Sequence, residues 1–323
     1  MTVDEDIFAW DSDFIDSWTP LSNRHSDARA LLMLGAFKGS ASGKAENISV
    51  SLMGCLDEWT RILRPYFERS VAALPSVSQL KSAERPKILL TEEEPCHWRN
   101  VPQARKAFVW GVLHLDQKAS AKHEHIAKLL PFIMQLADDY EAVARIDGMK
   151  CISHLTTGES GKLILSMGLD DLWWKTVLNS FQGAAHDNRI LCGIAGDLLI
   201  EELMQLRPMG DPVWLKRADE LVTFIVRQTV LSQSSAEANF YIEMLSRLLP
   251  RMSIAIVRHL KSIVKMLEEL PGEFVGYPSI ETVVTCLLNQ AWPRLALYTE
   301  RLIKVIRSLE SSSPLIHKLQ NLS

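Results

Sequence analysis

The sequence has few cysteines and lacks the close cysteine pairs of metal and redox sites. Its 323 residues include five cysteines, and no two of them stand in a Cys-x-x-Cys arrangement. Zinc ribbons and dithiol redox centres use that spacing, so neither is predicted. Cys151 and Cys192 fall within apolar helical patterns, where a buried, reduced thiol is expected. An odd number of scattered cysteines fits a reducing compartment.

The sequence also lacks an excess of basic charge and any long hydrophobic run. Its 35 Lys and Arg stand against 39 Asp and Glu, for a net charge of −4, which gives no reason to expect nucleic acid as a partner. No run of about 18 apolar residues predicts a membrane-spanning helix. The first residues, MTVDEDIFAWDSDF, are acidic and lack the pattern of a signal peptide. We therefore expect a cytoplasmic and nuclear protein with no membrane partner.

Catalytic motifs are missing as well. Neither Gly-x-Ser-x-Gly nor His-Glu-x-x-His occurs, and the paired acids are better explained as helix caps and turns. The segment Gly158–Lys162 resembles the end of a phosphate-binding loop. That loop needs Gly and Ser or Thr where Leu155 and Leu163 stand. A solvated turn between helices is expected there instead.

Two groups of residues have the chemistry of metal ligands. They are Cys96-His97 and His123-x-His125. Positions i and i+2 do not share a helix face, and no spacing unites the two groups. We therefore predict a non-enzymatic protein with no catalytic residue, no metal site and no cofactor.

Helical periodicity fills the sequence from Gln103 onward. Apolar residues recur three and four positions apart, and the alternating pattern of strands is missing. The predicted helices cover residues 103–116, 121–137, 140–156, 160–167, 170–182, 188–206, 212–231, 235–249, 253–269, 279–291, 293–309 and 314–321. This pattern predicts an all-α protein with more than half of its residues in helices.

The stretch from His125 to Leu155 indicates how these helices pair. It has the pattern of two short helices joined by a turn at Asp138-Asp139, and Pro131 is expected to bend the first helix. Such a pair cannot bury its apolar face alone and implies stacked neighbours. Most successive pairs start at intervals close to the ~40–47-residue repeat length of HEAT and armadillo arrays. We predict an α-solenoid of HEAT- or armadillo-like antiparallel helix pairs, which usually serves as a surface for other proteins.

Several helix ends can be predicted from local residues. Gly210–Pro212 has the pattern of a helix stop, an N-cap and a first-turn proline. Ser234 and Glu237 have the spacing of a capping box. Ser253 is a candidate cap for the helix that follows it, and Pro293 fits a first helical position.

The region before residue 103 has a different composition. We predict a helical segment over residues 1–74, with a flexible loop near 38–47. The stretch 75–102 contains four prolines, and is predicted to be a linker or an ordered crossing segment before the solenoid of 103–323. Residues 4–18 mix acids with aromatic and aliphatic side chains. They form either a first amphipathic helix or a flexible segment that docks on a partner.

The central part of the sequence resembles a conserved block of the Tti-two family, the second Tel-two-interacting proteins. In that block a helix ends in Leu-Leu-Pro, an Asp-Asp turn follows, and a glycine-containing helix leads to a Gly-Leu helix start. The matching positions here are His125, Leu129-Leu130-Pro131, Asp138-Asp139, Gly148 and Met167-Gly168-Leu169. The continuation DNRILCGIAGDLLIEEL also fits, and the resemblance extends over roughly 105–310. Ala127 departs from the family pattern, which more often has Leu there, and the region before residue 100 matches poorly.

The resemblance implies a role that composition does not. Members of the family are non-enzymatic subunits of the Triple T complex, together with the Tel-two and Tti-one proteins. That complex acts with the Hsp90 chaperone and its R2TP adaptor. Its clients are the phosphatidylinositol-3-kinase-related protein kinases of the DNA damage response and TOR signalling. The resemblance therefore implies a co-chaperone scaffold that holds Tti-one and supports maturation of these kinases.

Two other classes of protein stay open from the sequence. The chain is alternatively another HEAT or armadillo interaction scaffold, unrelated to these kinases, such as a transport or phosphatase scaffold. An all-α enzyme would require a polar pocket with converging acids or histidines, and the sequence indicates none.

The C-terminal third is predicted to carry the partner surface. The helix 293–309 has more apolar surface than one neighbour needs. Helix 314–321 covers this surface in one interpretation, and a larger solenoid partner packs against it in the other. The nine tryptophans likewise either fill spaces between helices or anchor a partner. The predicted partner-binding residues are Trp292, Arg294, Tyr298, Arg301 and Tyr277.

Overall fold

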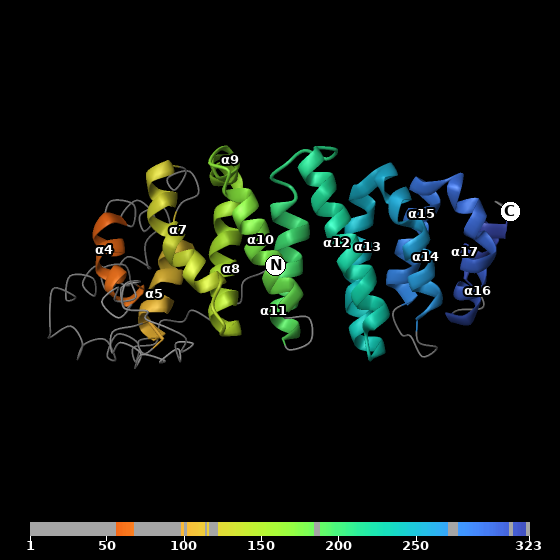
Figure 1. Cartoon of the computed structure of the whole chain (residues 1–323), viewed down its shortest axis with the longest axis horizontal. Helices are drawn as coiled ribbons and strands as arrows, with labels where there is room; N and C mark the ends of the chain where they lie inside the picture. The colour runs from red at the N-terminus through yellow and green to blue at the C-terminus, as the bar shows by residue number, and fades with distance from the viewer. Residues whose placement is uncertain are drawn as a thin grey trace, which may run out of the picture. The chain divides into compact units, whose positions relative to one another are not determined.

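In the computed structural model, every described secondary-structure element is helical (Figure 1). The structure describes residues 56–67, 98–99, 102–113, 115, 122–183, 188–270, 277–309 and 313–320. No strand occurs within those ranges, so the prediction of an all-α protein is confirmed. The chain divides into two compact units between Ser180 and Phe181.

Some sequence predictions lie outside the described residues. They concern the acidic segment 4–18, the loop near 38–47 and most of the stretch 75–102. The domain boundaries proposed from the sequence therefore stay predictions.

The first unit is built from short helices. They are α4 (Leu56–Phe67), α5 (Pro102–Leu113), α7 (His123–Ala137), α8 (Ala142–Thr156), α9 (Gly158–Ser166) and α10 (Leu169–Gly183), which crosses the division. The consecutive helices α7 and α8 form a helical hairpin, α4 contacts α5 and α7, and α8 contacts α5 and α9. The helices predicted between residues 103 and 182 are confirmed, with ends that differ by at most three residues.

Asp139 holds the turn between α7 and α8. Its carboxylate accepts a hydrogen bond from the Glu141 amide at 2.9 Å, and it also forms an ion pair with Arg99. The Arg99 guanidinium lies 4.6 Å from the centre of the Tyr140 ring. The turn predicted at Asp138-Asp139 is thus confirmed, and the buried Asp139 carboxylate binds both the Glu141 amide and Arg99.

Three phenylalanines from three helices form the centre of the first unit. The Phe67 ring centre lies 5.0 Å from that of Phe132 and 5.4 Å from that of Phe108, and the last two are 5.2 Å apart. Trp98 stacks against Phe67 and is almost fully buried. Tilted and edge-on pairs of this kind contribute about 0.5–1.5 kcal/mol beyond the burial of their area. This cluster joins α4, α5 and α7.

The second unit contains longer helices and three irregular turns. Its elements after α10 are α11 (Arg189–Asp197), the π-helical turn η4 (Leu198–Leu203), α12 (Pro212–Leu231), α13 (Ser235–Met252), the 3-10 turn η5 (Ser253–His259), α14 (Leu260–Glu268), α15 (Tyr277–Ala291), the 3-10 turn η6 (Arg294–Tyr298), α16 (Thr299–Leu309) and α17 (Pro314–Gln320). α12 pairs with α13, α13 contacts α15, α14 contacts α12 and α16, and α16 contacts α17. The main contacts therefore join helices that are close in sequence.

Two predicted helix starts are confirmed by their hydrogen bonds. Asp211 caps α12 because its carboxylate accepts from the Val213 amide at 2.8 Å, and Gly210 before it has a φ of +88°. The Ser234 hydroxyl accepts from the Glu237 amide at 3.2 Å and caps α13. In both cases the capping residue and its partner are at most three positions apart.

Two predicted helix starts are wrong, and so is one predicted turn. Ser253 does not cap the start of a helix: α13 continues to Met252, and Ser253 is its C-cap, with a φ of +50°. The predicted helix 253–269 is consequently the 3-10 turn η5 followed by α14. Pro293 precedes another 3-10 turn, so α16 begins at Thr299. The solvated turn expected at Gly158–Lys162 is also wrong, because α9 begins at Gly158 and buries part of that segment.

Candidate protein-interaction surface

Two of the predicted partner residues lie where α15 ends. Trp292 is 44% exposed, and Arg294, the first residue of η6, is exposed as well. Tyr277 is the first residue of α15 and lies at its opposite end, and its side chain is outside the described set. The structure therefore brings Trp292 and Arg294 together and leaves Tyr277 apart from them.

The other two predicted residues lie further along the chain and contact each other. The Arg301 guanidinium is 5.7 Å from the centre of the Tyr298 ring. Arg301 also forms an ion pair with Glu268 of α14. That hydrogen-bonded pair lowers the pKa of Glu268. Arg301 is thus already engaged within the chain.

An open groove of about 650 Å³ lies beside Trp292 and is called the Trp292 groove from here on. Its walls come from three segments. They are Met209, Gly210, Trp214 and Leu215 around the start of α12, residues between 251 and 258 at the end of α13 and in η5, and 290–294 between α15 and η6. The Gln290 side-chain amide donates a hydrogen bond of 3.1 Å to the carbonyl of Pro250. That bond fastens α15 to α13 next to the groove.

Large apolar side chains are exposed around the Trp292 groove. Met209 is 72% exposed and Ile254 is 76% exposed, in addition to Trp292. Trp214 also lines the groove but is almost fully buried. Single exposed apolar residues are ordinary on a protein surface, whereas several around one hollow mark a binding site.

Among the described residues that line the groove, every charged one is an arginine. Arg251 pairs with Glu201. Arg258 donates to Asp219 at 2.6 Å, and its side chain is still 53% exposed. Arg294 has no ion pair or hydrogen bond to another described residue. The groove therefore carries a positive charge that the described part of the chain does not balance.

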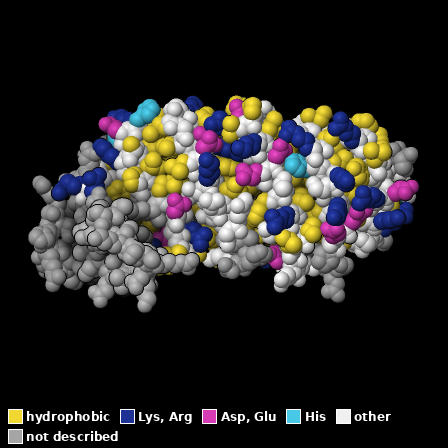
Figure 2. All heavy atoms as spheres, in the orientation of Figure 1, with side chains coloured by type: hydrophobic (Ala, Val, Ile, Leu, Met, Phe, Trp, Pro, Cys, Tyr) yellow, Lys and Arg dark blue, Asp and Glu magenta, His cyan; other side chains and the backbone are white. Residues whose placement is uncertain are grey.

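This positive charge is local to the groove. Figure 2 shows basic and acidic side chains intermixed with hydrophobic ones over the face that it draws. The whole chain is slightly acidic, with a net charge of −4. A partner attracted to the groove thus responds to a few arginines and not to a broad basic surface.

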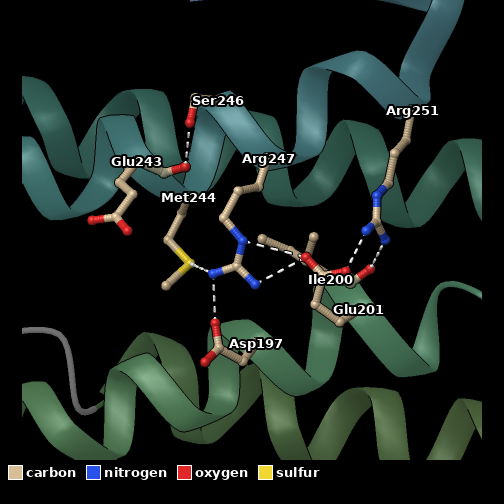
Figure 3. Close-up of polar contacts among 8 residues, drawn as sticks. All are labelled: Asp197, Ile200, Glu201, Glu243, Met244, Ser246, Arg247 and Arg251. Carbon is tan, nitrogen blue, oxygen red and sulfur yellow. Dashed lines mark hydrogen bonds and ion pairs between the residues drawn. The ribbon is translucent and has the colours of Figure 1, made fainter. Parts of the chain in front are cut away.

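A network of hydrogen bonds holds Arg251 in position (Figure 3). Arg251 donates to the carbonyl of Ile200 at 2.6 Å and also binds Glu201. Arg247 donates to Asp197 at 2.6 Å and to the second oxygen of Glu201 at 2.9 Å. Partial burial acts to raise the pKa of Glu201, but the two arginines outweigh it and the pKa lies below its ordinary value. Arg251, which lines the groove, is therefore held by both Ile200 and Glu201.

The π-helical turn η4 contributes to this network. The sequence predicted one helix over 188–206, but α11 ends at Asp197 and continues as η4. Asp197 and Glu201 both face Arg247 of α13 (Figure 3). π-Helical turns inside helices recur at functional sites.

The apolar stripe of the last long helix is covered within the chain. Leu302 and Ile306 are fully buried, and α16 contacts both α14 and α17. This arrangement agrees with the interpretation in which the final helix covers the stripe. Leu297 in η6 lies outside this stripe, and 83% of it is exposed.

Sequence reasoning missed three residues of the groove: Met209, Ile254 and Arg258. Met209 precedes the predicted helix stop at Gly210. Its position beside that turn could have indicated that this large apolar side chain is exposed. Ile254 fits a helical apolar pattern and gave no sign. It directly follows Ser253, whose positive φ at the end of α13 the local sequence did not predict.

The described residues offer little for other kinds of site. Among them, no group of three or more His, Cys, Asp or Glu side chains is placed to hold a metal ion. Cys96 and His97 lie outside the described ranges. Cys151 and Cys192 are free and buried, as the sequence predicted. None of the described helices is long and apolar enough to cross a bilayer.

Comparison with known proteins bears on the first unit most directly. Residues 55–182 match the sequence model of the Tti2 family, which confirms the resemblance to this family. The bounds differ from those predicted: the match includes residues 55–100, which were expected to match poorly, and it ends at 182, before the expected end near 310. The human protein named TELO2-interacting protein 2 is 20% identical over 221 residues, which is 66% of this chain and 43% of that protein. The mouse protein of the same name is 20% identical over 222 residues, 66% of this chain and 42% of its own length. No solved structure matches significantly.

The match therefore spans less than half the length of these relatives. The Trp292 groove, built from residues between 209 and 294, lies outside the segment that matches the family. The family match and the groove are thus separate observations.

Proposed function

We propose that this chain, whose residues 55–182 match the Tti2 family, is a non-enzymatic scaffold subunit of the Triple T co-chaperone complex. The family match carries this proposal, and similarity to a human protein named for its interaction with TELO2 supports it. Its partners are the Tti-one and Tel-two proteins. With Hsp90 and R2TP, it supports the maturation and stability of phosphatidylinositol-3-kinase-related kinases in the cytoplasm and the nucleus.

The proposed architecture is an α-solenoid of HEAT- or armadillo-like helix pairs. The α7–α8 hairpin and the α12–α13 pair support it, as do main contacts between helices close in sequence. In such arrays each repeat packs on its neighbours and leaves extended surfaces for another protein. The mechanism is scaffolding: the helical surface holds the larger Tti-one solenoid in a form that receives clients.

The proposed partner-binding residues are centred on Trp292 and Arg294. Trp and Arg are the residue types that most often dominate the energy of an interface. The exposure of Trp292 and the lack of an ion pair at Arg294 among the described residues support these two. Tyr298, Arg301 and Tyr277 complete the proposed set. Arg301 is expected to contribute less, because Glu268 already holds it.

Affinity purification tests this function. The full chain, tagged and expressed in its own cells, is purified and its partners are identified by mass spectrometry, with the tag alone as the control. Tti-one and Tel-two are expected among the most enriched proteins. Recovery of neither protein by a well-expressed, folded chain would show that the proposed function is wrong.

A further inference from the structure

We infer that the Trp292 groove binds an acidic segment of a partner protein, with one large apolar side chain of that segment packed beside Trp292. The inference takes one premise from the proposed function, namely that this site binds a protein. The chemistry of the segment follows from the groove itself.

The apolar side chains of the groove favour binding of an apolar side chain of the partner, the anchor. Met209, Ile254 and Trp292 expose most or much of their surface to water at its rim. A Leu, Phe or Trp side chain placed between them removes apolar surface of both partners from water, which favours binding. A volume of about 650 Å³ is typical of sites for ligands larger than one side chain. The groove therefore has room for an anchor and its neighbours in a peptide.

The charged part of the groove calls for carboxylates. Arg294 is exposed and has no partner among the described residues. Arg258 contacts Asp219 through one of its nitrogens, so it retains N–H donors for an incoming group. A carboxylate pairs with two N–H groups of an arginine at once, which gives both strength and orientation. A basic segment would meet only arginines along the lining.

The two acids of the Glu201 network are already paired, so they do not balance the positive charge of Arg294. Glu201 binds Arg251 and Arg247, and the latter also binds Asp197. These contacts balance two arginines with two carboxylates. Arg294 has no acidic partner among the described residues, and it lies beside the position of the apolar anchor. An acidic residue next to an apolar one in the partner satisfies both features.

The groove is also held in place before a partner arrives. Gln290 ties α15 to the carbonyl of Pro250, and the network around Glu201 fixes Arg251 (Figure 3). A site that is already ordered loses little conformational entropy on binding. A short segment is therefore sufficient to bind it.

A random peptide library displayed on phage tests the inference without assuming any partner. The probe is a library of 12-residue peptides, selected on the full chain and counter-selected on its Arg294→Glu variant. The enriched peptides are expected to hold two or more Asp or Glu within a few residues of Leu, Phe or Trp. A selection that enriches nothing, or that enriches basic or uncharged peptides, would overturn the inference.

The best selected peptide is then synthesised, labelled and titrated by fluorescence anisotropy. Arg294→Glu and Trp292→Ala are each expected to weaken its binding roughly tenfold or more, a loss equivalent to about 1.4 kcal/mol. Arg307→Glu is the matched control, since Arg307 is exposed on α16 and does not line the groove. Binding should also weaken as salt rises, because exposed charges are screened. Equal affinity of the Arg294 and Arg307 variants would contradict the charge assignment, provided that both are helical by circular dichroism.

The outcomes separate this inference from the proposed function. If Tti-one is recovered from cells but no acidic peptide is selected, the function stands and the groove inference fails. If acidic peptides bind but Tti-one is not recovered, the groove inference stands and the function fails. A second copy of this chain as the occupant would appear in sedimentation as a dimer that Arg294→Glu disrupts. That result would also overturn the inference.

Discussion

Gly148 of α8 lies against the backbone of Ala137, the last residue of α7. A Cβ atom at position 148 would come within 2.5 Å of the Ala137 amide nitrogen and 2.7 Å of its Cα. These are backbone atoms, so they cannot move aside as the end of a flexible side chain can. The absence of a side chain at Gly148 therefore sets how closely the two helices of the hairpin approach.

Replacing this glycine should destabilise the first unit. Gly148→Ala is expected to lower the free energy of unfolding by about 1–3 kcal/mol, the usual cost of overpacking, even though alanine is the better helix former. Thermal unfolding followed by circular dichroism measures the change. Gly183→Ala is the control, since a Cβ there meets nothing within 4 Å. Equal unfolding midpoints for the two variants would contradict this account of the hairpin.

How well the sequence predicted each feature depends on how far apart in sequence the interacting residues lie. The helix 212–231 was predicted with both ends correct. Its start could be predicted because the Asp211 cap and its partner Val213 are two positions apart in sequence. Ser253 was misassigned because its φ of +50° has no local signature. α13 also continues through Pro250 to Met252, whereas the sequence predicted its end at residue 249.

The candidate site was predicted only in part for the same reason. Trp292 and Arg294 were identified from their residue types and their place near the end of the chain. The groove itself needs Met209, Ile254 and Trp292 to converge from three segments, and periodicity within one segment does not report such convergence. The network between Glu201 and Arg247 likewise joins residues 46 positions apart.

The network around Glu201 should make stability depend on pH. The folded-state pKa of Glu201 lies below its ordinary value of 4.5, so the ion pairs add stability above that pH. The contribution is lost as the pH falls through the folded-state pKa. Glu201→Gln is expected to cost up to about 1 kcal/mol at pH 7, because the pair is partly exposed and screened. Well below pH 4.5 the variant and the natural protein should unfold at the same temperature.

Glu243 provides the matched control for this measurement. It lies on α13 near the network, but its carboxylate has no ion pair to another described residue (Figure 3). Glu243→Gln should leave the unfolding temperature unchanged at every pH. A Glu201→Gln effect that persists at low pH would show that the ion pairs are not its cause.

The buried thiols should react slowly with alkylating agents. Burial raises the pKa of Cys192 to about 12 and that of Cys286 to about 11. At pH 8 both are almost wholly protonated, and the thiolate is the reactive form. Iodoacetamide labelling, followed residue by residue with mass spectrometry, is expected to be at least roughly tenfold slower in the folded chain than in guanidinium. Equal rates in the two conditions would mean that these cysteines are accessible.

Loss of both predicted anchors should weaken binding to Tti-one. The combined change of Trp292→Ala and Arg294→Ala is expected to reduce recovery of Tti-one in a pull-down, because a buried Trp or Arg anchor contributes about 2 kcal/mol or more. Both side chains are exposed in the free chain, so the far-UV circular dichroism should stay helical. The pair Ile190→Ala and Arg307→Ala is the control, since both residues are exposed and neither lines the groove. Full recovery by the folded Trp292 and Arg294 variant would place the interface elsewhere.

Rapid depletion of this protein in its own cells tests the proposed co-chaperone role most directly. The chain is fused to an inducible degradation tag, and quantitative mass spectrometry follows the proteome after depletion. Phosphatidylinositol-3-kinase-related kinases are expected to fall together in amount while their messenger RNA levels stay constant, and expression of an untagged copy should restore them. If these kinases stay at normal amounts after complete depletion, and newly made kinase also reaches normal amounts, the proposed role is contradicted.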